Sequence, residues 1–129
     1  VAEGMFSRQI LGNMDANHPR MKESADHMLQ HLPKNKGNQA DYYYWYYGTL
    51  SSYMNKGEVW EKWNPVMREI LIDRQVKGGR DEGSWDYKHG NHSKQMGRVI
   101  TTAIATLSLE VYYRYLPSAK SGTAQVPQS

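Results

Sequence analysis

The sequence contains no cysteine and only one phenylalanine, although tyrosine and tryptophan are abundant. Without cysteine the chain forms no disulfide framework, binds no metal through thiolates and has no cysteine nucleophile. The ten Tyr and four Trp residues each combine a large apolar ring with one polar tip. Such side chains favour packed surfaces, grooves and pockets over a purely aliphatic core.

Long apolar runs and dense basic stripes are also missing. No stretch approaches the length of a membrane-spanning helix, and no signal peptide is recognisable. The net charge is +3, but the Lys and Arg residues are scattered along the chain. We therefore expect no membrane span and no nucleic-acid partner. Because the first residue is Val rather than Met, we expect the chain to be part of a longer product.

The aromatic stretch "DYYYWYYGTL", residues 41–50, predicts a helix in spite of its β-propensity. A stripe of apolar residues recurs every three or four positions, as in a helix: Tyr43, Tyr46, Tyr47, Leu50, Tyr53 and Met54. Asp41 is a suitable N-cap and Gly57 a suitable stop, which predicts a helix over residues 42–55. We expect the tyrosines of this stripe to form core against the outer helices.

Four further segments carry apolar residues at helical spacing and predict an all-α chain of about five helices. They are residues 3–13, 19–32, 58–75 and 97–116. We interpret Asn64 as the cap of a fresh helix with Pro65 at its first position, or Pro65 as the site of a kink. Pro117 is expected to end the last helix, and residues 118–129 to form a flexible tail.

The helices also show a faint internal repeat. The first, third and fifth share one pattern of small and apolar residues, and the second and fourth share another. This alternation predicts antiparallel helical hairpins. An array that begins and ends within such a pattern usually needs a neighbour to cover its open ends.

Two sets of motifs resemble a known superfamily. Gln75, followed by Gly83-Ser84-Trp85 and then "TTAIATLSLEVYYRYLP", resembles the repeat of terpenoid cyclases and protein prenyltransferases. The stretches "YYWYYGT", Trp60-x2-Trp63-Asn64, "GSWD" and "LEVYYRYLP" resemble bacterial prenyltransferase and squalene-oxidase-repeat proteins. The resemblance covers roughly residues 3–117. It implies that residues 1–117 form part of an α/α toroid, with odd helices inside and even helices outside.

The same resemblance implies a structural motif made by Gln75, Gly83 and Trp85. A Gln side chain can bond the free groups at a helix end, and a Trp ring can cover that end while donating its N–H. Seven residues separate Gln75 from Gly83, more than the repeat usually has, so a looser packing is expected. The cyclases' Asp-x-Asp-Asp motif is missing from the sequence, and so is the cysteine of the prenyltransferase zinc site. The resemblance therefore implies no catalytic residue and no cofactor within these residues.

Asp86, His89 and His92 have a spacing that can bring metal ligands together, so they form a candidate metal site. The glycine-rich loop around them is poorly preorganised, and a solvated loop is the alternative interpretation.

Tyr44, Trp45 and Tyr112 are the candidate ligand-binding residues. Tyr44 and Trp45 lie off the main stripe, and together with Tyr112 from the last helix they would line a cavity. An aromatic lining suits an apolar or isoprenoid ligand. The leading hypothesis is a non-catalytic toroid-repeat module that binds an apolar ligand or a protein partner through this face. The alternatives are the C-terminal part of a cyclase-like enzyme whose acid lies upstream, and a self-associating structural module.

Overall fold

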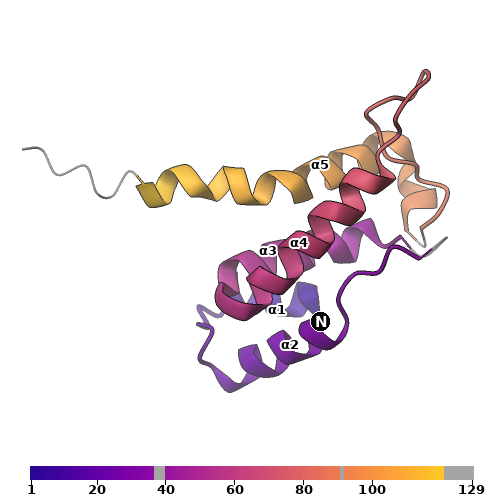
Figure 1. Cartoon of the computed structure of the whole chain (residues 1–129). Coiled ribbons are helices and arrows are strands. Elements are labelled where there is room, and N and C mark those ends of the chain that lie inside the picture. Colours follow the sequence, from indigo (N-terminus) through magenta and orange to yellow (C-terminus); the bar gives the residue numbers. More distant parts are fainter. Residues whose placement is uncertain (37–39, 91, 121–129) are drawn as a thin grey trace, which may run out of the picture.

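The structure, a computed structural model, describes residues 1–36, 40–90 and 92–120, with residues 112–120 described by their backbone only. Within these residues the chain forms five helices and no strands, which confirms the all-α prediction. The helices are α1 (Ala2–Ile10), α2 (Pro19–Gln30), α3 (Tyr42–Asn55), α4 (Gly57–Arg74) and α5 (Ser93–Lys120). Figure 1 shows the C-terminal part of α5 extending beyond the other helices.

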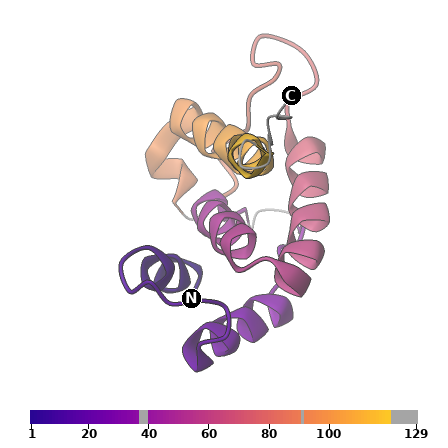
Figure 2. The same ribbon diagram turned by 90° about the vertical axis from the view of Figure 1, so that its left-hand side faces the viewer.

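The helices are arranged in two layers. Helices α1, α3 and α5 lie side by side, with α3 in the middle, and α2 and α4 form the second layer (Figure 2). Helix α3 packs extensively against α1, α4 and α5, whereas α4 and α5 contact each other only weakly. The alternation of two sequence patterns along the chain thus corresponds to an alternation between two layers.

Helix α3 contains the aromatic stretch and has the bounds expected from the sequence. The Asp41 carboxylate caps its start by accepting a hydrogen bond from the Tyr44 backbone N–H at 3.0 Å. The helix ends at Asn55, and its C-cap, Lys56, has a positive φ of 60°. Helix α4 begins at the next residue, so the chain reverses at this point (Figure 1).

Helix α4 is continuous, and Pro65 lies inside it rather than at the start of a new helix. The expectation of a fresh cap at Asn64 is therefore wrong. Pro65 has no N–H to donate to the preceding turn, which costs one helical hydrogen bond. The buried residues on both sides of it hold the helix together by packing: Val59, Trp63, Met67, Ile70 and Leu71.

Helix α5 has a break at Gly97, whose φ of 74° and ψ of 177° are not helical. A short helical segment, residues 93–96, precedes this break, so helical structure begins earlier than the sequence predicted. The helix also continues past Pro117 to Lys120, and the expected end at Pro117 is not observed. The remaining part of the expected tail, residues 121–129, lies outside the described residues.

The contact between α3 and α4 is close because Gly48 has no side chain. The six-membered ring of Trp63 lies directly against this position, and a Cβ atom at Gly48 would overlap it. The ring is fully buried, and its N–H donates to the Thr49 hydroxyl at 3.0 Å. Gly48 and Thr49 therefore mark the side of α3 on which α4 packs.

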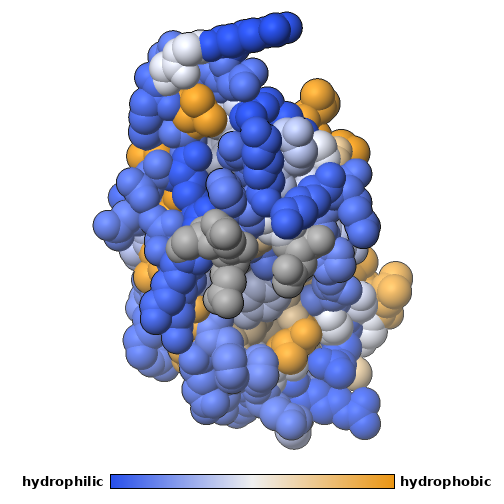
Figure 3. Space-filling view, turned by 90° about the vertical axis from the view of Figure 1, so that its right-hand side faces the viewer, coloured by the Kyte–Doolittle hydropathy of each residue, from blue (hydrophilic) through white to orange (hydrophobic). Residues whose placement is uncertain are grey.

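The surface is mostly hydrophilic on the side shown in Figure 3, where hydrophobic residues form small separate patches. Several large apolar side chains are nonetheless exposed, among them Tyr43, Val99 and Ile100. In the part of the chain that the structure describes, no helix is both long enough and apolar enough to cross a bilayer.

Candidate functional site

An aromatic face lies on α3 on the side away from α4. It is formed by Phe6 of α1 together with Tyr43, Tyr46 and Tyr47 of α3. The Tyr47 ring is its centre and meets the other three edge-on, with centroid distances of 5.7 Å to Phe6, 4.9 Å to Tyr43 and 5.4 Å to Tyr46. Edge-to-face contacts of this kind stabilise a cluster of rings. The aromatic face is thus an ordered surface rather than a set of separate side chains.

The exposure of these rings corrects the expected orientation of α3. Tyr43 is 37% exposed, and Tyr46 and Tyr47 are half-buried, whereas Trp45 is only 3% exposed. Tyr53 packs edge-on against Trp60 of α4 at 5.1 Å, as expected, but Tyr43, Tyr46 and Tyr47 do not pack against the outer helices. At the start of α3 the outer helices meet the other side, which carries Gly48 and Thr49, so these three tyrosines are left partly open.

A hollow of about 360 Å³ lies beside the aromatic face. It is lined by residues from the starts of three helices and from the turn before α5: Glu3, Tyr43, His92, Gln95 and Met96. The His92 ring stands 6.4 Å from the Tyr43 ring, between centroids. A concave surface lined by rings and a thioether offers apolar contact area with a few polar groups at its edge.

The surroundings of three tyrosines at the start of α3 raise the pKa of their hydroxyls. The hydrogen-bonding hydroxyl of Tyr47 raises the pKa of Tyr43 above its ordinary value of 10.0, and the nearby Glu3 carboxylate acts in the same direction. Burial raises the pKa of Tyr42 and of Tyr44. In all three tyrosines the shift favours the protonated, neutral form of the phenol.

Tyr44 and Trp45, the ligand-binding candidates of the sequence, lie on the α4 side of α3. Trp45 belongs to the core, with its ring edge-on to Tyr42 at 5.1 Å and the Arg74 guanidinium 5.7 Å from its centroid. Tyr44 packs edge-on against Trp63 at 5.7 Å, and its hydroxyl donates to the His31 carbonyl at 3.3 Å. The structure therefore separates both residues from the aromatic face.

Tyr112, the third ligand-binding candidate, lies on the backbone of α5, but its side chain is outside the described residues. Residues that the sequence did not single out occupy the neighbourhood of the aromatic face instead. Phe6 joins it from α1, and Met96 reaches its hollow from α5. The sequence contained one clue to Phe6, because it lies in an apolar stripe of a short helix that needs a partner.

Gln75, Gly83 and Trp85 meet at the end of α4. The Gln75 side-chain amide donates to the Gly83 carbonyl at 2.9 Å, and the Gln75 and Trp85 backbones form an isolated antiparallel bridge. The buried Trp85 ring donates its N–H to the Leu71 carbonyl at 2.8 Å. Its backbone N–H donates to the Thr102 hydroxyl of α5 at 3.1 Å. Trp85 thus links the last turn of α4, the loop and α5.

Asp86, His89 and His92 are not brought together as metal ligands. One Asp86 oxygen accepts from the Lys88 backbone N–H at 2.8 Å, and the other lies 3.9 Å from the Arg98 guanidinium. The His92 ring lies beside Tyr43 instead. Across the described ranges, no group of three or more His, Asp or Glu residues is placed to hold a metal ion.

Comparisons with protein-family models, curated proteins and solved structures find no match to this chain. The geometry of its own residues therefore carries the functional argument.

Proposed function

We propose that this chain is a non-catalytic helical-repeat module that binds an apolar ligand through the aromatic face of α3. We also propose that its two layers form part of an α/α toroid, with α1, α3 and α5 on the inner side. The layer arrangement supports this proposal, because the odd and even helices occupy different layers. In such a toroid the aromatic face would face the cavity that the inner helices enclose.

The observation that carries the proposal is the position of Tyr43. Its ring is 37% exposed, yet it is held in place by Tyr47 and borders the hollow beside α5. Large apolar groups that remain exposed within an ordered, concave cluster are typical of binding sites. Because the face is made of four aromatic rings, it is suited to a ligand with extended apolar area, such as an isoprenoid.

A Tyr43→Ala substitution tests the proposal with farnesol, an isoprenoid alcohol, as the probe. Titration of the isotope-labelled chain, followed by amide chemical shifts, should show saturable changes at residues of α3 and at the start of α5. The substitution should weaken binding by about five- to tenfold, because it removes the most exposed ring of the face. It should change the free energy of unfolding by no more than about 1 kcal/mol.

The matched control is Ile72→Ala, which removes a large apolar side chain that is 50% exposed on α4. This variant should bind farnesol as the unmodified chain does. Equal affinity of the unmodified chain and the Tyr43 variant would reject the aromatic face as the binding site. So would farnesol-induced shifts that cluster outside α3 and α5.

A further inference from the structure

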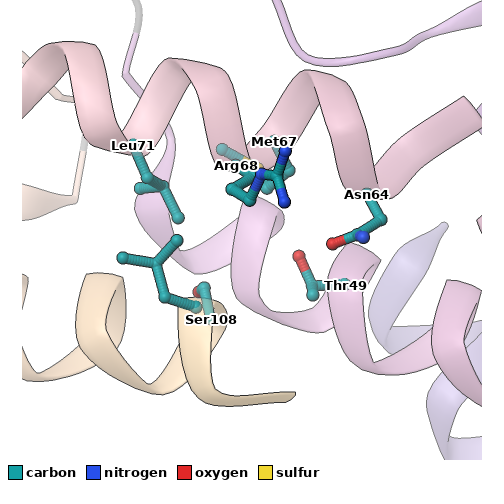
Figure 4. A pocket seen from close by; sticks show the side chains of 7 residues that line it. Thr49, Asn64, Met67, Arg68, Leu71 and Ser108 are labelled. Carbon is teal, nitrogen blue, oxygen red and sulfur yellow. The ribbon is translucent and has the colours of Figure 1, made fainter. Parts of the chain in front are cut away.

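A second hollow lies on the other side of α3, where α3, α4 and α5 meet. Its volume is about 250 Å³, and it is lined by Thr49 of α3, by four residues of α4 and by two of α5: Asn64, Met67, Arg68, Leu71, Ser108 and Leu109 (Figure 4). It exists because α4 and α5 both pack on α3 but contact each other only weakly. None of its lining residues belongs to the aromatic face.

The hollow has an apolar wall. Met67 and Leu71 of α4 are almost fully buried, at 2% and 1% exposure, and Leu109 faces them from α5 as a half-buried residue. The hydroxyls of Thr49 and Ser108 already donate to carbonyls of their own helices, at 2.7 Å and 2.8 Å. These two hydroxyls therefore have no proton left to offer a ligand.

The donors that remain come from Asn64 and Arg68, which lie one turn apart on the same side of α4. Figure 4 shows both side chains extending over the space above Thr49. In the part of the chain that the structure describes, Arg68 belongs to none of the ion pairs. Among the described residues that line the hollow, Arg68 alone carries a formal charge.

We propose that this hollow binds a small amphipathic carboxylate. The two oxygens of a carboxylate match the fork of the Arg68 guanidinium, and the Asn64 amide supplies a further N–H. The alkyl part of the same molecule would cover Met67, Leu71 and Leu109. Arg68 is exposed, so its guanidinium can be reached by a ligand from solvent. A cationic head group would be repelled by it. The volume has room for about eight water-sized groups, which suits a short alkyl chain.

Octanoate is the probe that tests this site, with the complete 129-residue chain. Titration should produce saturable amide shifts at residues 49, 64, 68 and 108. Arg68→Gln should weaken octanoate binding by about tenfold or more, because a charge-assisted pair is lost. The same substitution should leave binding of octanol, which has no carboxylate, unchanged. Arg68→Lys, which keeps the charge but not the fork, should give an intermediate affinity.

Arg80→Gln is the matched control, since it removes the same charge from an exposed residue of the loop between α4 and α5. It should bind octanoate as the unmodified chain does. Three results would overturn the proposal: the absence of saturable shifts, an unchanged affinity in Arg68→Gln, or acetate binding as tightly as octanoate. The last result would mean that the hollow binds an anion without using its apolar wall. Because the aromatic face contributes no residue here, failure of farnesol binding leaves this test unaffected.

Discussion

Replacing Trp85 by alanine is expected to lower the free energy of unfolding by about 3–5 kcal/mol. The ring is only 3% exposed, and its N–H bonds the Leu71 carbonyl in the last turn of α4. Its loss leaves a cavity between that helix end and α5, and it removes the donor that satisfies a helix-end carbonyl. Since a domain of this size is stable by about 5–15 kcal/mol, the loss would be a large fraction of the total.

Urea unfolding followed by circular dichroism measures this effect without relying on tryptophan fluorescence. Trp85→Phe separates burial from hydrogen bonding, because it keeps most of the ring and loses the N–H; its cost should be about 1–2 kcal/mol. Val99→Ala, at a residue 82% exposed, is the control and should change stability by less than about 0.5 kcal/mol. An unchanged midpoint in Trp85→Ala would mean that this residue does not hold α4, the loop and α5 together.

Trp63→Ala should destabilise the chain by a similar amount, about 3–5 kcal/mol, because it opens the contact between the two layers. The Trp63 ring is fully buried and fills the space left by Gly48. It also donates to the Thr49 hydroxyl at 3.0 Å and meets Tyr44 edge-on. Thermal unfolding monitored by circular dichroism is a direct measurement of this loss.

Ile72→Ala, on the same helix but half-exposed, serves as the control and should leave the melting temperature nearly unchanged. If the Trp63→Ala variant had the same melting temperature as the unmodified chain, this would contradict the packing of α4 against Gly48. A double substitution of Trp63→Ala with Gly48→Leu should recover part of the lost stability, since the new side chain enters the vacated space.

The sequence predicted the helical state of the aromatic stretch but not its orientation. The spacing of Tyr43 and Tyr47 shows that these residues share one side of a helix. It does not show which side meets the neighbouring layer, because α3 is aromatic almost all round at its start. Gly48 indicates which side packs, because a residue without a side chain permits the closest approach of another helix. The side of α3 that meets α4 is thus the one with Gly48, and Tyr43 and Tyr47 lie on the more open side.

The α4 and α5 boundaries show a second limit of local patterns. Pro65 disfavours a helix interior, yet α4 continues through it because buried residues on both sides pack against α3. Gly97 interrupts α5 without ending it, and the turn before the break contributes Met96 to the hollow beside Tyr43. In both helices tertiary packing determines whether the helix continues. The preference of a single residue type does not predict this packing.

The two layers and their separate hollows also could not be derived from spacing alone. Arg68 and Asn64 face the same space as Leu109, which lies about 40 residues further along the chain. Only the packing of α5 on α3 brings these residues together. For Gln75 and Trp85, by contrast, the sequence motif implied a contact around a helix end. The structure gives the distances of that contact.

Native mass spectrometry of the chain, purified without detergent, tests the proposed aromatic binding face most directly. The proposal predicts a monomer that carries additional mass in the lipid range, and loss of that mass in the Tyr43→Ala variant but not in Ile72→Ala. A dimer or larger oligomer without additional mass would contradict it and would indicate that the open face is covered by a second copy of the chain. Additional mass that persists unchanged in the Tyr43→Ala variant would contradict it as well.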